Sequence, residues 1–150
     1  MRNCCLELSA CGEKAFRVFL DILKQELDCL GIVDISSIQA FILMNVNDNV
    51  ITMGEVLSRG YYVGSNASYN VKKMISNGYM KQNPSEYDKR ASYLSLTDKG
   101  LELCQKLENA VNQHMSRFEA TISGKQELER GLKFMKKIES YWQDILTRRI

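Results

Sequence analysis

The sequence GSNASYNVKKMISNG, residues 64–78, has the pattern of a short helix with one buried face. Gly64 and Ser65 supply a turn and an N-cap, and Asn77-Gly78 supplies a stop, because glycine tolerates the positive φ at which many helices end. Apolar residues recur between these signals at the spacing of a single helix face: Ala67, Val71 and Met74. The sequence therefore predicts a helix over 65–77 that packs against a core.

The opposite face of this helix carries short hydrogen-bonding groups, one aromatic ring and two cations. These residues are Ser65, Asn66, Ser68, Tyr69, Lys72, Lys73 and Ser76. Short polar groups near a helix start suit base edges, and cations further along suit phosphates. The same composition also fits the solvated face of an ordinary amphipathic helix, so the helix alone leaves both interpretations open.

The residues after this helix favour the first interpretation. Residues 79–83 predict a short strand ended by Pro84, the only proline in the chain, because proline has no N–H for a sheet ladder. Residues 85–92 are polar and charged, and Leu94 and Leu96 then alternate as in a half-buried return strand. Helix, strand, charged loop and strand in this order predict the core of a winged helix-turn-helix.

The preceding segment supplies the rest of that core. Residues 36–39 resemble a capping box that opens a short helix, whose predicted buried residues are Ile38, Phe41 and Ile42. Val50 and Ile51 are suited to a third strand. Residues 52–55 resemble a second capping box, for a helix that ends at Ser58 or Arg59. That helix, a turn over 59–64 and the helix over 65–77 predict the helix-turn-helix pair.

Long amphipathic helices flank the core. Residues 6–30 predict a first helix with a stop at Gly31, and Thr97 is the expected cap of a helix over 101–122 that precedes a last helix. The apolar series of the helix over 101–122 is Leu101, Cys104, Leu107, Val111, Met115, Phe118 and Ile122. The series of the last is Leu128, Leu132, Met135, Ile138, Trp142 and Ile145. The last helix is too apolar for an isolated surface helix, and two adjoining apolar stripes on the first helix are too wide for a single small neighbour, so burial by a second copy of the chain is expected.

The predicted fold class is therefore mainly α with a small β-wing. A single domain over 1–150 would contain a winged helix-turn-helix core at about 34–97, with dimerisation helices at about 5–30 and 98–147. A chain of 150 residues is long enough to bury a core of this kind.

The sequence DKRASYLSLTDKG, residues 88–100, resembles the wing signature of the MarR family of bacterial transcriptional regulators. In that signature an Asp-x-Arg pair precedes a Leu-Thr and a Gly at this spacing. The run over 59–70 resembles one branch of the family, the regulators associated with L,D-transpeptidase genes. The resemblance implies a homodimer whose first and last helices form the interface.

In the DNA-binding interpretation, the helix over 65–77 lies in the major groove of double-stranded DNA. Its early residues Ser65, Asn66 and Ser68 face base edges. Tyr69, Lys72 and Lys73 reach further, to a thymine methyl group, a guanine edge or a phosphate.

The wing over 84–92 is expected beside the minor groove, where Arg90 can enter the negative potential of narrow A·T-rich DNA. Asp88 can brace that guanidinium, and Lys89 adds a cation. The resemblance implies the same roles for Asp88 and Arg90. The recognition helices of a dimer lie about 34–36 Å apart, so the expected operator is a pseudo-palindrome with half-sites about 10 base pairs apart.

The distribution of charge agrees with nucleic acid as the partner. The whole chain carries a net charge of +2, but residues 59–96 hold six cations and two anions, a net charge of +4, which leaves −2 for the remainder. Such a concentration is the electrostatic footprint of a DNA-binding surface. The start of the sequence lacks the apolar segment of a signal peptide and no apolar run could cross a bilayer, so a cytoplasmic protein without a membrane partner is expected.

The resemblance also implies a small aromatic or phenolic effector, bound between the winged domain and the dimer helices. Wall residues of such a cleft would be Phe16, Phe19, Leu20, Phe41 and Cys104, each of which also fits an ordinary core position.

Thiol sensing is the rival form of regulation. The five cysteines are expected to be free thiols, since the chain has no secretory signal and their spacing suggests no pairing. Cys29 and Cys104 are the candidates for a redox role, because each lies near a predicted helix end, where thiolate character can change.

Other classes of protein have little support. The sole histidine, His114, has no nucleophile motif, phosphate-binding loop or carboxylate cluster near it, so no catalytic residues, metal site or cofactor are expected. The alternative that remains is a winged-helix module that binds another protein and does not read DNA.

Overall fold

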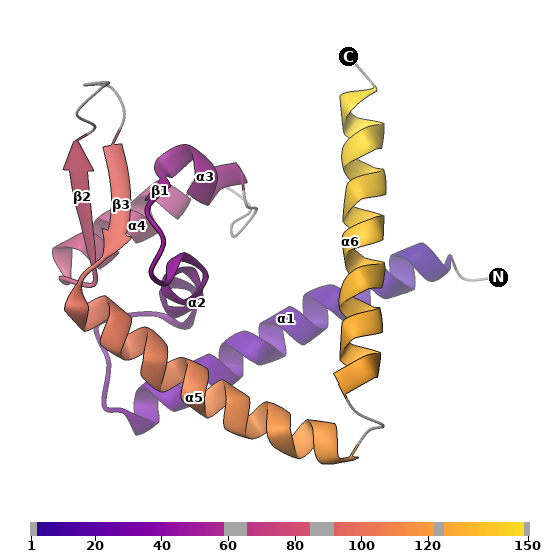
Figure 1. The fold of residues 1–150 in the computed structure, drawn as a ribbon, viewed down its shortest axis with the longest axis horizontal. Coiled ribbons are helices and arrows are strands. Elements are labelled where there is room, and N and C mark those ends of the chain that lie inside the picture. The colour runs from indigo at the N-terminus through magenta and orange to yellow at the C-terminus, as the bar shows by residue number, and fades with distance from the viewer. Residues whose placement is uncertain (1–2, 59–65, 85–91, 122–124, 149–150) are drawn as a thin grey trace. The chain divides into compact units, whose positions relative to one another are not determined.

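The computed structural model describes residues 3–58, 66–84, 92–121 and 125–148 (Figure 1). The elements are α1 (Cys4–Cys29), α2 (Ser37–Val46), β1 (Ile51–Thr52), α3 (Met53–Ser58), α4 (Asn66–Ser76), β2 (Met80–Pro84), β3 (Ser92–Leu96), α5 (Asp98–Thr121) and α6 (Lys125–Thr147). The predicted fold class, mainly α with a small sheet, is confirmed. The chain divides into two compact units, 1–110 and 111–150, so the prediction of a single domain stays a prediction.

Local hydrogen bonds set the two ends of α1. The Asn3 side chain accepts a hydrogen bond of 3.0 Å from the backbone N–H of Cys5, so the helix begins two residues before its predicted start. At the other end, the N–H of Ile32 bonds to the carbonyl of Leu27 at 2.9 Å, and Gly31 takes a φ of 69°. This is the Schellman arrangement, which confirms the predicted stop at Gly31.

Both predicted capping boxes form. In α2 the side chains of Ser36 and Gln39 bond reciprocally to each other's backbone N–H, at 3.3 and 3.0 Å. In α3 the side chains of Thr52 and Glu55 do the same, at 3.2 and 2.7 Å. Each box satisfies backbone donors that would otherwise lack a partner at a helix start.

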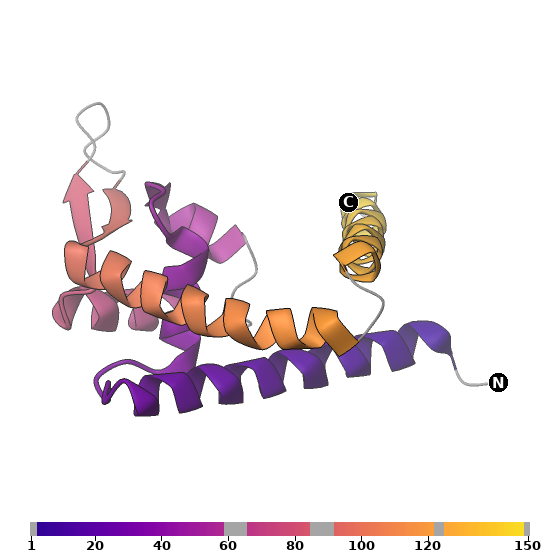
Figure 2. The same cartoon turned by 60° about the horizontal axis from the view of Figure 1, so that its bottom comes forward.

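The sheet is antiparallel, with strand order β1-β3-β2. Ile51 pairs with Leu94, and Met80 pairs with Leu96, and all four of these side chains are buried. The predicted third strand forms one residue later than expected, over Ile51–Thr52 with the exposed Val50 outside it, and the inward face of β3 is confirmed. Figure 2 shows the β2–β3 pair rising from the end of α4.

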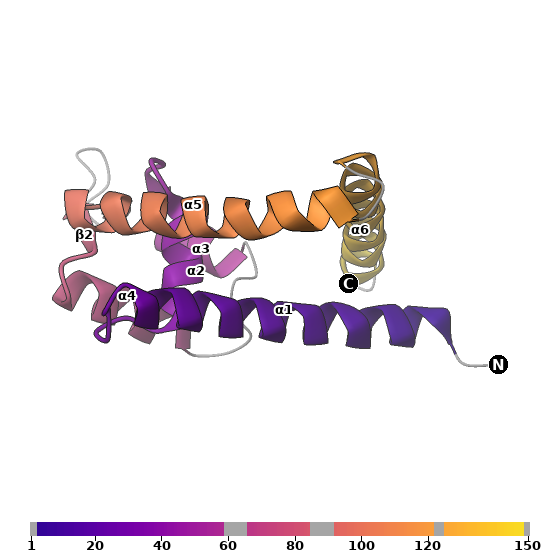
Figure 3. The same ribbon diagram turned by 90° about the horizontal axis from the view of Figure 1, so that it is seen from below.

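The core of the first unit takes buried side chains from α1, α2, α3, α4, the start of α5 and all three strands. Figure 3 shows the ribbons of α1, α2 and the start of α5. Its fully buried side chains include Leu27, Ile42, Leu43, Val46, Ile51, Val56, Val71, Met74, Met80, Leu94 and Leu107. In α5 the prediction was wrong at Leu101, which is 36% exposed, while Leu103 is buried. Gly100 is itself buried, so the inner face of α5 is centred on Gly100, Leu103 and Leu107, and Leu101 lies at its edge.

A polar joint, formed by Asp34, Asn77–Tyr79 and Thr97–Gly100, connects the end of α4 to the start of α5. The Tyr79 hydroxyl donates to Asp34 Oδ1 at 2.7 Å, and Lys99 Nζ lies 3.3 Å from Asp34 Oδ2. Lys99 Nζ also lies 3.9 Å from the Tyr79 ring centroid, a cation–π contact. The hydrogen bond from Tyr79, with Lys99 beside it, lowers the pKa of Asp34, while burial and that carboxylate raise the pKa of Tyr79.

Two backbone segments lie close together at this joint. The carbonyl of Tyr79 accepts a 3.0 Å hydrogen bond from the N–H of Thr97, and Thr97 Oγ1 donates to the carbonyl of Gly78 at 2.6 Å. The same Oγ1 accepts from the N–H of Gly100 at 3.2 Å, which confirms Thr97 as the cap of α5. A Cβ on Gly100 would lie 2.2 Å from the Tyr79 carbonyl oxygen. Only glycine therefore allows α5 to pack here without a shift of backbone.

We expect Gly100→Ala to lower the free energy of unfolding by about 1–3 kcal/mol, the range for overpacked sites, because the backbone at Tyr79 must move. Urea unfolding at fixed protein concentration measures this change. The matched control is Gly54→Ala in α3, where a new Cβ has ordinary contact with Thr52 Oγ1 at 3.7 Å. Its unfolding free energy should stay the same or rise by up to about 1 kcal/mol. Equal stabilities of the two variants would contradict the role given to Gly100.

Candidate nucleic-acid interface

The inner face of α4 lies in the core, as predicted. Ala67, Val71 and Met74 are each at most 1% exposed. The helix ends in a second Schellman arrangement, in which the N–H of Tyr79 bonds to the carbonyl of Met74 at 2.9 Å and Gly78 takes a φ of 77°. The predicted stop at Asn77-Gly78 is thereby confirmed, and the joint that follows determines where α4 points.

The outer face of α4 is open to solvent. Its exposed side chains are Asn66, Ser68, Tyr69, Lys72, Lys73 and Ser76, and Tyr69 is 63% exposed. The lysines lie in the second half of the helix, and Asn66 and Ser68 lie in its first turn. Short polar groups thus lie ahead of cations on one surface, in the order that base edges and phosphates require.

One buried polar residue on α4 was missed by the sequence analysis. Asn70 is 8% exposed, and its Oδ1 accepts a 3.0 Å hydrogen bond from Nε2 of Gln39, which is 6% exposed. The signal that could have found it is its spacing, since Asn70 lies three residues after Ala67 and four before Met74, within the apolar stripe. The bond ties α4 to the first turn of α2.

The predicted wing tip lies outside the described residues. Asp88, Lys89 and Arg90 belong to this tip, and Ser65, which precedes α4, also lies outside the described residues, so the DNA-binding roles of all four stay predictions. The strands on either side are described: Gln82 of β2 donates from Nε2 to Ser92 Oγ of β3 at 2.7 Å. The resemblance over 59–70 also stays a prediction, because residues 59–65 are not described.

The structure brings three of the predicted effector-site residues together. The rings of Phe16 and Phe41 have centroids 5.1 Å apart at an interplanar angle of 68°, and those of Phe19 and Phe41 are 6.1 Å apart at 79°. These edge-to-face contacts join α1 to α2. Leu20 is half-buried on the same helix as Phe16, whereas Cys104 is a member of the core cluster.

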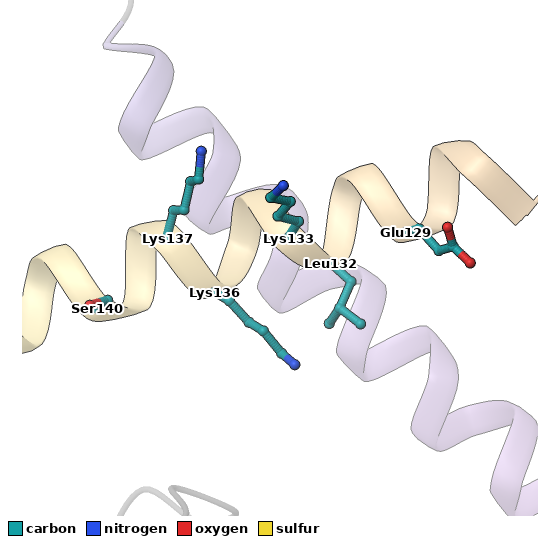
Figure 4. A pocket seen from close by; sticks show the side chains of 6 residues that line it. All are labelled: Glu129, Leu132, Lys133, Lys136, Lys137 and Ser140. Atoms are coloured by element: carbon teal, nitrogen blue, oxygen red, sulfur yellow. The ribbon is translucent and has the colours of Figure 1, made fainter.

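A hollow elsewhere on the surface follows α6. It is lined by Glu129, Leu132, Lys133, Lys136, Lys137 and Ser140, none of which is buried. Figure 4 shows Lys133 and Lys137 projecting to one side of the helix, with Leu132 and Lys136 on the other. These side chains diverge and do not converge on one point, so the hollow lacks the enclosed geometry of a ligand site.

The two candidate redox cysteines differ sharply. Cys104 is 1% exposed, and burial, with Glu108 nearby, raises the pKa of its thiol to about 12. The thiolate is the reactive form, so at neutral pH this environment suppresses the reactivity that a sensor needs. Cys29, in contrast, is exposed at the last position of α1. The structure therefore disfavours a redox role for Cys104 and leaves Cys29 accessible.

Within the described residues there is no group of three or more His, Cys, Asp or Glu side chains that could hold a metal ion. No helix in the described ranges is long and apolar enough to cross a membrane.

Comparisons with known proteins agree with this geometry. Residues 35–100 match the family model of the winged helix DNA-binding domain. The exopolysaccharide II synthesis transcriptional activator ExpG of Rhizobium meliloti (strain 1021) is 33% identical over 136 residues, which cover 91% of this chain and 70% of that protein.

Solved structures share the fold. BldR, a transcriptional regulator from Sulfolobus solfataricus, superposes with a TM-score of 0.72 at 18% identity, over 91% of this chain and 99% of that one. A MarR transcriptional regulator from Methanosarcina mazei gives a TM-score of 0.72 at 17% identity, over 91% and 96% of the two chains.

The matched segment contains the helix pair and the strands described above, and the relatives are regulators of transcription, not enzymes. The chain belongs to the MarR family of winged helix-turn-helix transcriptional regulators.

We expect a thiol reagent such as a disulfide-exchange chromophore to react quickly with Cys29 and slowly with Cys104 in the native protein, because the Cys104 thiol is buried with a raised pKa. Cys29→Ala should remove one rapidly reacting thiol, whereas Cys104→Ala should leave the number of rapidly reacting thiols unchanged. Loss of a fast thiol in Cys104→Ala would show that Cys104 is reactive after all.

Proposed function

We propose that this protein is a homodimeric, sequence-specific regulator that inserts α4 into the major groove of a pseudo-palindromic operator, with its wing beside the minor groove. We further propose that a small aromatic or phenolic effector modulates its DNA affinity. The observation that carries the proposal is the division of α4 between a face held in the core and a solvent-exposed face of short polar groups and cations.

The groove-facing roles follow from side-chain reach. An amide at Asn66 can donate to and accept from a base edge, which distinguishes one base pair from another. The ammonium groups of Lys72 and Lys73 end long flexible stems, so they neutralise phosphates with little dependence on sequence. With the helix N-terminus toward the bases, the first turn specifies the sequence and the second half supplies affinity.

The exposed apolar surface of α6 supports the homodimer. None of its side chains is buried, and large apolar residues are 36–64% exposed along its length: Leu128, Leu132, Phe134, Met135, Tyr141, Trp142, Ile145 and Leu146. A monomer in water rarely exposes so much apolar surface on one helix, so burial against a second copy removes an unfavourable exposure. In such a dimer each of the two copies of α4 would bind one half-site of the operator.

Fluorescence anisotropy of the purified protein tests DNA reading. The protein is titrated onto labelled DNA from upstream of its own gene and onto a scrambled duplex, across a salt series. We expect tighter binding to the native duplex and an affinity that falls steeply as salt rises, because cations on the protein release counterions from DNA. Equal, weak binding to both duplexes would instead favour the alternative of a winged-helix module that binds another protein.

Two substitutions on α4 should separate affinity from specificity. Lys72→Ala should weaken binding to both duplexes and reduce the slope of affinity against salt by about one unit per subunit, because one phosphate contact is lost. Asn66→Ala should leave the slope unchanged and cost about 1–3 kcal/mol of discrimination at a defined base pair. Measurements on a series of single base-pair changes would locate that pair.

The matched control for these variants is Lys106→Ala on α5, which removes an exposed cation whose Nζ lies 2.6 Å from Glu102. It should leave the salt slope unchanged. If Lys72→Ala changed sequence preference but not the salt slope, the roles assigned along α4 would be wrong.

The ring contacts between α1 and α2 support the effector proposal. Phe41 makes edge-to-face contacts with both Phe16 and Phe19, so an aromatic ligand could replace one of these contacts with a similar one. Because the rings belong to two helices, a ligand among them would change how α2 packs on α1. Thiol sensing through the exposed Cys29 is the alternative form of regulation, and oxidant sensitivity of the DNA complex would distinguish it.

Phe41→Leu should raise the concentration of hydroxybenzoate needed to release half of the bound DNA by about 2–10-fold, the equivalent of one aromatic contact. The control is Phe118→Leu, a half-exposed phenylalanine on α5, which should leave that concentration unchanged. Anisotropy of the preformed DNA complex, titrated with the compound, measures the release. Identical release curves for the wild type and Phe41→Leu would contradict the assigned site.

A further inference from the structure

We propose that the buried hydrogen bond between Gln39 and Asn70 is a positioning contact for DNA reading. It sets the rotation of α4 about its own axis, and so gives Gln39, a buried residue on another helix, control over sequence discrimination. This inference rests on the proposed reading of DNA by α4.

The orientation of Gln39 is determined from its own helix. Its Oε1 accepts a 3.0 Å hydrogen bond from the backbone N–H of Ser36, as part of the capping box of α2. With the oxygen occupied there, the amide nitrogen points away from the cap and donates to Asn70 Oδ1 at 3.0 Å. The start of α2 thus sets the position of the donor, Gln39 Nε2. The hydrogen bond forms only if α4 is oriented so that Asn70 Oδ1 lies within reach of that atom.

This contact is directional, unlike its neighbours on the inner face of α4. Ala67, Val71 and Met74 make apolar contacts, whose energy depends on buried area and changes little over a small rotation of the helix. A hydrogen bond weakens steeply with misalignment, and both partners are at most 8% exposed, so a broken bond would leave polar groups without water. Among these inner-face contacts, the amide pair is the one that resists rotation.

Small rotations matter at base edges. Side chains end about 5–6 Å from a helix axis, so a rotation of about 10° moves them by about 1 Å. A displacement of this size disrupts hydrogen bonds to bases, which tolerate only a few tenths of an ångström. Lys72 and Lys73 can follow the phosphates over the same displacement because their stems are flexible. Loss of the pair should therefore reduce discrimination and preserve the salt dependence of binding.

Two substitutions of Gln39 test the pair without changing α4 itself. Gln39→Met has a similar length and no amide, so it cannot bond to Asn70. Gln39→Glu keeps an acceptor for the N–H of Ser36, and the Asn70 amide can turn to donate to the second carboxylate oxygen. We expect Gln39→Met to lower the ratio of affinities for native over scrambled DNA by about tenfold, the equivalent of one base contact. Gln39→Glu should keep the ratio within about twofold of the wild type.

The ratio and the salt slope are measured by anisotropy, at a temperature at which circular dichroism shows each variant to be folded. Val71→Ala is the matched control, because it removes buried apolar volume from α4 and leaves the amide pair in place. It should lower thermal stability and keep the affinity ratio. If Gln39→Met does not fold, Asn70→Ala breaks the same bond from the other side and should lower the ratio in the same way.

The inference would be overturned by an unchanged ratio in Gln39→Met, by an equal loss in Val71→Ala, or by a failure of Gln39→Glu to restore discrimination. A wild-type protein that does not distinguish the two duplexes would instead contradict the proposed function itself. The wild-type titration therefore separates failure of the inference from failure of the DNA-reading proposal.

Discussion

The packing of α4, β3 and α5 in the first unit depends on contacts at the backbone carbonyl group of Tyr79. It accepts a hydrogen bond from the N–H of Thr97 and packs closely against Gly100. These contacts hold the end of β3 and the start of α5 against the segment that follows α4. Thr97 adds a side-chain bond to the carbonyl of Gly78, and Tyr79 and Lys99 meet at Asp34. Because α4 ends one residue before Asn77, this joint determines where the DNA-facing helix stops and which way it points.

The contacts of α4 divide its placement between two kinds of force. Apolar burial of Ala67, Val71 and Met74 supplies the stability that keeps the helix on the core. The Gln39–Asn70 bond adds little net stability, since folding exchanges it for bonds to water, but it has a direction that apolar packing lacks. Such a division suits a reading helix, because phosphate contacts tolerate displacement whereas base contacts do not.

Helix α2 links the two regions that the proposed regulation would connect. Gln39 lies in its first turn and bonds to α4, while Phe41, two residues later, packs against Phe16 and Phe19 of α1. A ligand among the rings would therefore act on the helix that also contacts α4. Regulation by thiol oxidation would act at a different place. Burial disfavours the thiolate at Cys104, so the accessible Cys29 at the end of α1 would be the reactive residue.

Residue type and spacing are enough to predict the features that depend on residues a few positions apart. The capping boxes at Ser36 and Thr52 and the stops at Gly31 and Gly78 were predictable, because each uses hydrogen bonds within one helix turn. Contacts between residues far apart in the sequence could not be predicted in this way, because they form only in the packed fold. Gln39 and Asn70 are 31 positions apart, and Asp34 and Tyr79 are 45 apart. The inner face of α5 likewise depends on where Tyr79 meets Gly100, which placed Leu103 in the core and left Leu101 at its edge. Local bonding is encoded in residue type and spacing, whereas these pairings exist only after the helices have packed.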